Sequence, residues 1–276
     1  MIIKNLLKTI LPSSLGLALV LSSACGQQES QTASEIKVTN GISASESAFP
    51  STVLLVSVSE AGEGICTGTF VNDSQVVTAG HCVEGMRREN PNLFYVTLGA
   101  DNEAIDSVRA RSYRRNPNYS MEVNGGVNPS DLAIVNFPRR TAPAISRIAT
   151  ISPEVGTDIT IVGYGNNRNF VTADDQLSGS GAGEKRYGVN QLAEIEEGFL
   201  TFYGLPEAQA GYASGEVVGA GAGDSGGPMF VGNEIVGVTS GGGLAETVDG
   251  LQVAVSHYVD LNSFESRAFL RRHLRR

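Results

Sequence analysis

The sequence lacks the features that mark several common classes of protein. It holds 20 lysines and arginines against 29 acidic residues in 276 residues, which gives a formal net charge of −9 at pH 7. A nucleic-acid partner needs a clustered basic surface, so this acidic excess argues against one. Three cysteines are too few for a disulfide scaffold, and the fold must therefore rest on hydrophobic cores.

Glycine and the hydrophobic residues are what the chain has in quantity. Thirty-three glycines, ten prolines and 41% hydrophobic residues come without sustained helical periodicity through the middle of the chain. This pattern is typical of many short strands joined by tight turns, so an all-β fold is predicted. The length suffices to bury one large hydrophobic core or two small ones.

The first 24 residues have the pattern of an export signal. Lys4 and Lys8 precede an apolar run centred on residues 15–21, and small residues follow as far as Ala24. The run is shorter than the roughly 20 residues that a membrane-spanning helix needs. Residues 1–24 are therefore predicted to be a signal peptide, and the mature protein to be exported to the periplasm or the extracellular space.

Cys25 has two interpretations. Residues 21–25, followed by Gly26, resemble a bacterial lipobox, in which Cys25 becomes the lipidated first residue and anchors the protein to the outer membrane before activation. Ser22 departs from that motif, where a larger aliphatic residue is usual, and an ordinary signal-peptidase cut after Ala24 is the alternative. We favour lipidation because an odd cysteine in an exported protein needs a reason.

The rest of the chain divides into a polar stretch and a folded domain. Residues 25–37 are rich in Gln, Ser and Glu with nothing to bury, so a flexible tether or propeptide is predicted there. The folded domain is predicted at residues 38–276.

Cys66 and Cys82 are the pair for which a bridge can be argued. The loop between them has a size for which bridging stabilises a fold by roughly 3 kcal/mol through the entropy of the unfolded chain. Because Cys82 follows His81, a bridge would also fix the backbone beside that histidine. The alternative is two unrelated buried thiols, but an oxidising compartment favours the bridge.

A candidate nucleophile lies in residues 223–228, Gly-Asp-Ser-Gly-Gly-Pro, whose three glycines permit backbone turns closed to other residues. The hydroxyl of Ser225 needs a neighbouring base to take its proton, and histidine is the usual one. His81 ends an apolar segment, and a strand end can present an imidazole to a cleft. His257, in an apolar stretch typical of a strand, and His273, in an arginine-rich tail, are interpreted as packed or surface residues.

Asp131 is the candidate for the third group, which must hold the other imidazole nitrogen and stabilise the imidazolium. It begins the hydrophobic segment 131–135, Asp-Leu-Ala-Ile-Val, where a carboxylate can be buried at the edge of a core. Taken alone, such an aspartate would be interpreted as a turn residue that caps a strand.

These segments resemble the trypsin and chymotrypsin family of serine peptidases. Residues 78–82 read Thr-Ala-Gly-His-Cys, and segments 131–135 and 223–228 follow in that family's order of histidine, aspartate and serine. Each motif is a modest signal alone, but the three in order are a strong one. Supporting stretches that are also similar to the family lie at 66–70, 96–99 and 161–165.

The resemblance covers most of residues 38–276 and implies two six-stranded antiparallel β-barrels, roughly 38–145 and 146–276, with the active site in the cleft between them. It also implies a short C-terminal helix. Such a protein would be a monomeric serine endopeptidase that acts on proteins or peptides and uses no cofactor and no metal. Two other functions stay open: a binding protein whose chemistry is lost, and a hydrolase of esters.

The resemblance implies a role for each candidate residue. Ser225 attacks the scissile carbonyl while His81 takes its proton, and Asp131 orients His81. The backbone N–H groups of Gly223 and Ser225 would form the oxyanion hole. Ser240 would donate a hydrogen bond to Asp131.

An activation step is implied at the start of the domain. Val38 occupies the place of the family's mature amino terminus, and Lys37 before it is a site that a trypsin-like activating protease could cut. The freed ammonium of Val38 would fold inward onto Asp224, because a buried carboxylate is tolerated only when it is paired. The alternative is that Lys37 belongs to a solvated linker.

The primary substrate pocket is predicted to be neutral. A pocket without an acid favours apolar or aromatic side chains, because burying a substrate charge without a partner is costly. Glu246 and Asp249 could bring an acid into it, but they are interpreted as solvated loop charges. The residues that the resemblance assigns to the pocket are Gly219, at its bottom, and Ser240, Gly242 and Gly250.

The arginines of the tail 261–276 also have two interpretations. Cations suit the C-terminal end of a helix, so packing and solvation account for them. Contact with an anionic membrane surface is the second interpretation. Otherwise the only membrane contact that we predict is through a lipid on Cys25.

Overall fold

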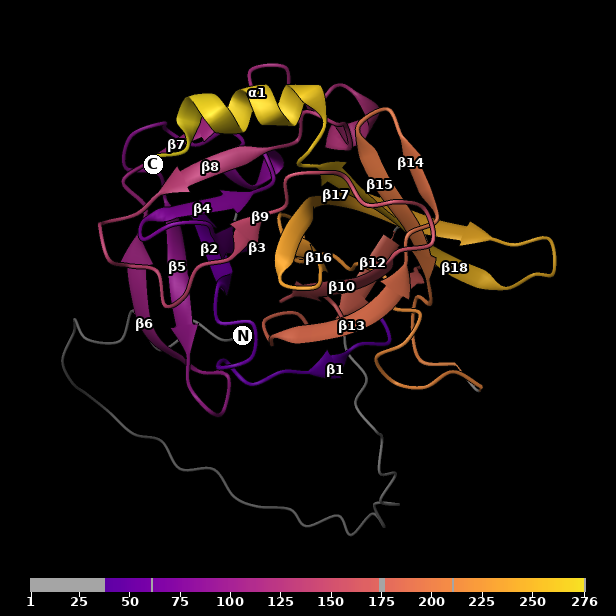
Figure 1. Cartoon of the computed structure of the whole chain (residues 1–276). Helices are drawn as coiled ribbons and strands as arrows, with labels where there is room; N and C mark the ends of the chain where they lie inside the picture. The colour runs from indigo at the N-terminus through magenta and orange to yellow at the C-terminus, as the bar shows by residue number, and fades with distance from the viewer. Residues whose placement is uncertain (1–37, 61, 174–176, 210, 276) are drawn as a thin grey trace, which may run out of the picture.

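The computed structural model describes residues 38–60, 62–173, 177–209 and 211–275 (Figure 1). Among these residues nearly every element is a β-strand, and α1 (Phe264–His273) is the single α-helix. No helix of this part of the chain is long and apolar enough to cross a bilayer. The predicted signal peptide and tether, with Cys25 and Lys37, lie outside the described residues.

The N-terminal half forms one antiparallel sheet with the strand order β6-β5-β2-β3-β4-β8-β7. Its central strand β2 is buried on both faces. Val53 and Leu55 enter the core of this half, whereas Leu54 and Val56 pack in a second cluster with Tyr164. The strands are β2 (Thr52–Ser59), β3 (Gly62–Phe70), β4 (Gln75–Thr78), β5 (Leu93–Leu98), β6 (Ala104–Arg109), β7 (Ser112–Arg115) and β8 (Ala133–Asn136).

The C-terminal half forms a second sheet with the order β1-β13-β10-β16-β17-β18-β15-β14, and β9 pairs with β17 in parallel. Its core gathers Ile161, Phe202, Val236 and Tyr258 from four strands. A separate two-stranded ribbon joins β11 (Arg168–Val171) to β12 (Leu177–Ser180). The sheet strands are β1 (Ile42–Ser43), β9 (Arg147–Ile148), β10 (Asp158–Gly163), β13 (Arg186–Gln191), β14 (Glu194–Glu196), β15 (Phe199–Gly204), β16 (Pro228–Val231), β17 (Glu234–Glu246) and β18 (Gln252–Asp260).

A further hydrophobic cluster, which we call the shared cluster, joins the two halves. It combines Leu132 and Ile134 of the first half with Val238 of the second and with Phe269 and Leu270 of α1. The Ser263 side chain begins the helix by accepting a hydrogen bond from the Ser266 N–H, which is the usual work of an N-cap residue. In Figure 1 the helix lies along one side of the molecule, next to β8.

The prediction of an all-β fold with a short C-terminal helix is confirmed. The two sheets hold seven and nine strands, not six each. The excess comes partly from very short edge pairings, since β1 and β9 have two residues each and β14 has three. Edge pairings of this length leave little pattern in a sequence.

Candidate active site

His81 follows strand β4 and begins a 3-10 turn, His81–Val83. Its Nδ1 lies 2.8 Å from Oδ2 of Asp131, and its backbone N–H donates to Oδ1 of the same carboxylate at 2.8 Å. Gly80 permits this approach, since a Cβ there would lie only 3.1 Å from Asp131 Oδ1. The imidazole is thus held at one nitrogen, while 25% of the side chain stays exposed.

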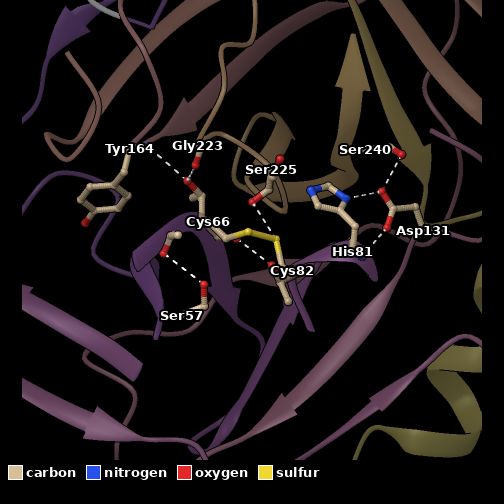
Figure 2. The surroundings of a disulfide bond; sticks show 12 residues. Ser57, Cys66, His81, Cys82, Asp131, Tyr164, Gly223, Ser225 and Ser240 are labelled. Atoms are coloured by element: carbon tan, nitrogen blue, oxygen red, sulfur yellow. Dashed lines mark hydrogen bonds and ion pairs between the residues drawn. A yellow bond between two sulfur atoms is a disulfide. The ribbon is translucent and has the colours of Figure 1, made fainter. Parts of the chain in front are cut away.

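Asp131 is completely buried just before strand β8. Besides the two contacts with His81, it accepts a hydrogen bond from Ser240 Oγ at 2.7 Å, and Figure 2 shows it between these two residues. Three donors on one carboxylate offset the cost of removing it from water. Its charge also acts on Tyr119, whose pKa is raised to about 12 by burial and then by Asp131.

Ser225 lies in a tight loop before strand β16, close to His81 in Figure 2. Gly226 has a φ of 81°, and a Cβ there would lie 2.0 Å from Thr78 Oγ1. Glycine at this position lets the loop pack directly on strands β3 and β4. The Thr67 N–H of β3 then donates to the Ser225 carbonyl at 2.8 Å. The serine loop of the second half is therefore fixed against the first half.

The predicted disulfide between Cys66 and Cys82 is confirmed. It ties strand β3 to the turn that carries His81, and Cys82 Sγ lies 3.6 Å from the Ser225 carbonyl oxygen. Figure 2 shows the bridge beneath the Ser225 loop. One covalent link thus supports the backbone beside both His81 and Ser225.

The N–H groups of Gly223 and Ser225 are those predicted to form the oxyanion hole. Within the described part of the chain, neither donates to a backbone carbonyl. The Gly223 carbonyl is itself occupied, because it accepts from Thr67 Oγ1 at 3.0 Å. The residue has a φ of 102°, a conformation that favours glycine. Both N–H groups are therefore free to bind an oxygen of another molecule.

Asp224 lies beneath this loop with both carboxylate oxygens occupied. Oδ1 accepts from the Gly165 N–H at 2.7 Å, and Oδ2 accepts from the Gly221 N–H at 2.8 Å. Burial raises the pKa of Asp224 to about 6, against the effect of these two bonds and of Arg186. Burial thus disfavours the charged form of this carboxylate, and a cation placed next to it would lower the pKa again.

Val38 is already buried, with 1% of its surface exposed, in the core of the second half. The next residue, Thr39, accepts from the Gly219 N–H at 3.2 Å through its carbonyl and donates to the Gly219 carbonyl at 2.9 Å through its hydroxyl. The predicted mature amino terminus therefore lies against the segment that leads to the Ser225 loop.

A cavity of about 180 Å³ opens beside Ser225, and none of the described residues in its lining is acidic. The sequence predicted Gly242 as a pocket residue but not most of the other lining residues. Asn169 comes from the β11–β12 ribbon, far from any motif, and its amide donates to the Ala220 carbonyl at 3.2 Å. The described lining residues are Asn169, Ala220, Gly221, Ala222, Ser225, Thr239, Gly241, Gly242 and Gly243.

Three of the residues assigned to the pocket lie elsewhere. Gly219 is buried behind it against Thr39, and Ser240 faces Asp131. Gly250 is exposed at the turn between β17 and β18. Gly219 lies against strand β18 of this hairpin, since a Cβ on it would meet Ala254 at 2.7 Å. The hairpin is long and extends from the body of the molecule in Figure 1, which carries Gly250 away from the cavity.

The two remaining histidines have other surroundings. His257 lies on β18, with Nδ1 3.0 Å from Thr201 Oγ1 and its ring against Phe199. His273 packs on Phe269 within α1. Among the three histidines, His81 is the one with a carboxylate on its ring.

The fold and the site together define a class: an all-β serine peptidase in which a serine loop meets a histidine and a buried aspartate where two sheets join. A family model described as trypsin matches residues 38–262, and the chain belongs to the trypsin family.

Several known proteins are similar to this chain. An anionic trypsin from Canis lupus familiaris is 26% identical over 81% of this chain and 87% of its own length. A trypsin from Saccharopolyspora erythraea is 27% identical over 74% of this chain and 86% of its own length. Among solved structures, a scabies mite inactivated protease paralogue, S-D1, superimposes with a TM-score of 0.60 at 14% identity, covering 84% of this chain and 95% of that one. This last likeness concerns the fold alone.

Proposed function

We propose that this chain is an active serine endopeptidase that cuts peptide bonds through an acyl-enzyme. The observation that carries the proposal is the contact of His81 with a buried, triply hydrogen-bonded Asp131, close to the Ser225 loop. A binding protein that had lost its chemistry would have no need of this pairing. A binding protein on the same fold is the alternative, since the S-D1 protein is described as inactivated.

In the proposed mechanism each group has one task. Ser225 Oγ attacks the scissile carbonyl, and His81 Nε2 takes its proton and later returns it to the leaving amine. Asp131 holds Nδ1 and stabilises the imidazolium. The developing oxyanion accepts hydrogen bonds from the Gly223 and Ser225 N–H groups, and one such donor typically contributes about 10²- to 10³-fold in rate. Water then releases the acyl group by the same path.

We further propose that the enzyme prefers an apolar or aromatic side chain before the cut bond. The described lining of the cavity consists of glycine, alanine, serine, threonine and one asparagine, and these residues offer no charge to pair a lysine or arginine of the substrate. A buried charge without a partner is costly. Protein or peptide substrates fit this cavity, as does the aryl or acyl group of an ester.

We also propose that a cut after Lys37 activates the enzyme. Val38 is buried close to the Ser225 loop, and Asp224 has no charged partner on its carboxylate oxygens among the described hydrogen bonds. A freed Val38 ammonium would supply one. Export, and an anchor on Cys25 before the cut, complete the proposal.

A fluorophosphonate probe tests whether the enzyme is active. The chain cut after Lys37 is expected to be labelled at Ser225, with Ser225→Ala as the unlabelled control. Folded, cut protein that takes no label would overturn the proposal and favour a binding protein. A peptide library and a set of aryl esters then separate the two hydrolases: turnover of esters alone would overturn the assignment as an endopeptidase.

A further inference from the structure

One face of α1 takes no part in the fold. Its inward side chains, Ser266, Phe269 and Leu270, are buried against the body of the protein. The outward side chains are exposed, and Phe264 has 93% of its surface in solvent. We call this surface the α1 outer face. It consists of Phe264, Ala268, Arg271 and Arg272 of the helix, together with Arg275 just after its end.

The arginines of the α1 outer face are not balanced by acids. The one acidic residue of the helix, Glu265, turns inward and accepts hydrogen bonds from Ser130 at 2.6 Å and from Asn118 at 2.9 Å. In the described part of the chain, Arg271 and Arg272 form no ion pair. Their charges are therefore open to a partner, although the whole chain carries a net charge of −9.

Other cations gather at the C-terminal end of the helix. Burial lowers the pKa of His273, and the charges of Arg114, Arg272 and Arg88 lower it further. The helix dipole accounts for a cation or two at this end. It does not account for Arg88, from the segment before β5, or for Arg114 of β7, which also pairs with Glu89 at 3.5 Å. The positive potential is thus a property of the surface, not only of the helix.

Exposed apolar side chains lie at the N-terminal end of the same helix. Phe264 begins the helix, and Ile151, with 76% of its surface exposed, lies on the neighbouring segment. Asn262 holds that segment next to α1 by donating to the Ile151 carbonyl at 2.9 Å, and the Arg267 guanidinium donates to the Thr150 carbonyl. Phe264 and Ile151 thus leave two large apolar side chains in water on neighbouring segments, and neighbouring exposed apolar groups rimmed by polar residues mark interaction sites.

We propose that the α1 outer face docks on an anionic lipid bilayer. Arg271, Arg272 and Arg275 would pair with lipid phosphates, while Phe264 and Ile151 would enter the boundary between headgroups and acyl chains. This combination of a cationic and an apolar set on one helix face is what an interfacial helix uses. An acidic polysaccharide or a nucleic acid would engage the arginines but would leave Ile151 uncovered. The inference does not depend on the proposed peptidase activity.

Vesicle binding tests the proposal with residues 25–276 carrying Cys25→Ser, which lacks the predicted signal peptide and any lipid on Cys25. The protein is expected to sediment with vesicles of phosphatidylglycerol and phosphatidylcholine, and not with phosphatidylcholine alone. Each arginine should contribute roughly fivefold to binding. The double variant Arg271→Gln/Arg272→Gln should therefore bind roughly 25-fold more weakly. Phe264→Ser should weaken binding to the same vesicles while keeping every charge.

The matched control is Arg109→Gln/Arg168→Gln, which changes the net charge equally at two exposed arginines on β6 and β11. It should stay within about twofold of the parent. Equal losses in both double variants would overturn the proposal, as would binding to neutral vesicles. So would binding to heparin or DNA in place of vesicles with the same dependence on Arg271 and Arg272. Circular dichroism of each variant checks that α1 is intact.

Discussion

At the scale of single residues, the hydrogen bonds of Asp131 allow the most direct test of the proposed catalysis. Both of its oxygens accept from His81, and Oδ2 also accepts from Ser240. Asp131→Asn would place an amide N–H₂ group against one of these donors and favour the wrong imidazole tautomer. We expect kcat to fall by about 10⁴-fold, the loss typical of this change in a Ser-His-Asp triad. The measurement is kcat on a peptide ester and a peptide amide.

Asp249→Asn is the matched control, because Asp249 lies at the exposed turn of the β17–β18 hairpin. It should leave both kcat and the substrate preference unchanged. An Asp131→Asn enzyme with nearly full activity would show that His81 does not act through this carboxylate. A change of preference in Asp249→Asn would show that the hairpin reaches the substrate.

Asp224 gives a prediction about pH. Its pKa in the uncut chain, about 6, lies above the value of about 3.9 in an unfolded chain. The folded state therefore binds the proton more tightly, and stability is lost as pH rises from about 4 through 6. Linkage puts the loss at about 3 kcal/mol. Cutting after Lys37 should lower this pKa by pairing the carboxylate with the Val38 ammonium, and so remove the loss.

Urea unfolding of the uncut and cut chains at pH 4.5 and 7.5 measures this difference. Asp224→Asn in the uncut chain, which carries no ionisable group at the position, is expected to lose the part of the pH dependence that separates the uncut from the cut chain. If the cut chain shows the same pH dependence as the uncut one, Val38 does not reach Asp224.

At the scale of elements, α1 holds the loop that carries Asp131. Glu265 at its first turn accepts from Ser130, Asn116 and Asn118. Partial burial acts to raise the pKa of Glu265, but these three hydrogen bonds outweigh it and lower the pKa overall. A lowered folded pKa stabilises the protein above the unfolded pKa, and this stability is lost as pH falls through the folded value.

Glu265→Gln should therefore reduce stability at pH 7 and flatten its decline toward acid. The free energy of unfolding at pH 7 and at pH 3 is the measurement. Glu234→Gln is the control, since its only described ion pair is a 3.8 Å contact with the exposed Arg147. An unaltered pH profile in Glu265→Gln would mean that the three hydrogen bonds do not depend on its charge.

The elements also show what the sequence could and could not predict. His81, Asp131 and Ser225 each stand in a short motif next to a buried strand, so their local surroundings were predictable. The disulfide was predictable because its cysteines flank a loop of suitable length. The cavity was not, because Asn169 comes from a ribbon without a motif and Gly250 depends on how far a hairpin extends. The helix was expected over the tail, and the Ser263 cap sets where it begins.

At the scale of the whole molecule, the shared cluster determines whether the two halves unfold together. Two independent barrels would unfold in two steps, but Leu132, Val238 and Leu270 join both sheets and α1 in one buried cluster. The Ser225 loop also bonds to Thr67 of the first half. Because separating the halves would expose this cluster and break the loop contacts, we expect a single cooperative transition.

Leu132→Ala tests this expectation, since Leu132 is fully buried in the shared cluster. It should destabilise the whole protein by about 2–5 kcal/mol and shift one calorimetric transition without dividing it. Leu55→Ala, which removes an equally buried leucine from the core of the first half alone, is the comparison. If the halves are coupled, both variants shift the same single peak. A separate peak for the second half in either variant would show that the shared cluster does not bind the halves together, and the cleft that holds His81 and Ser225 could then open without unfolding.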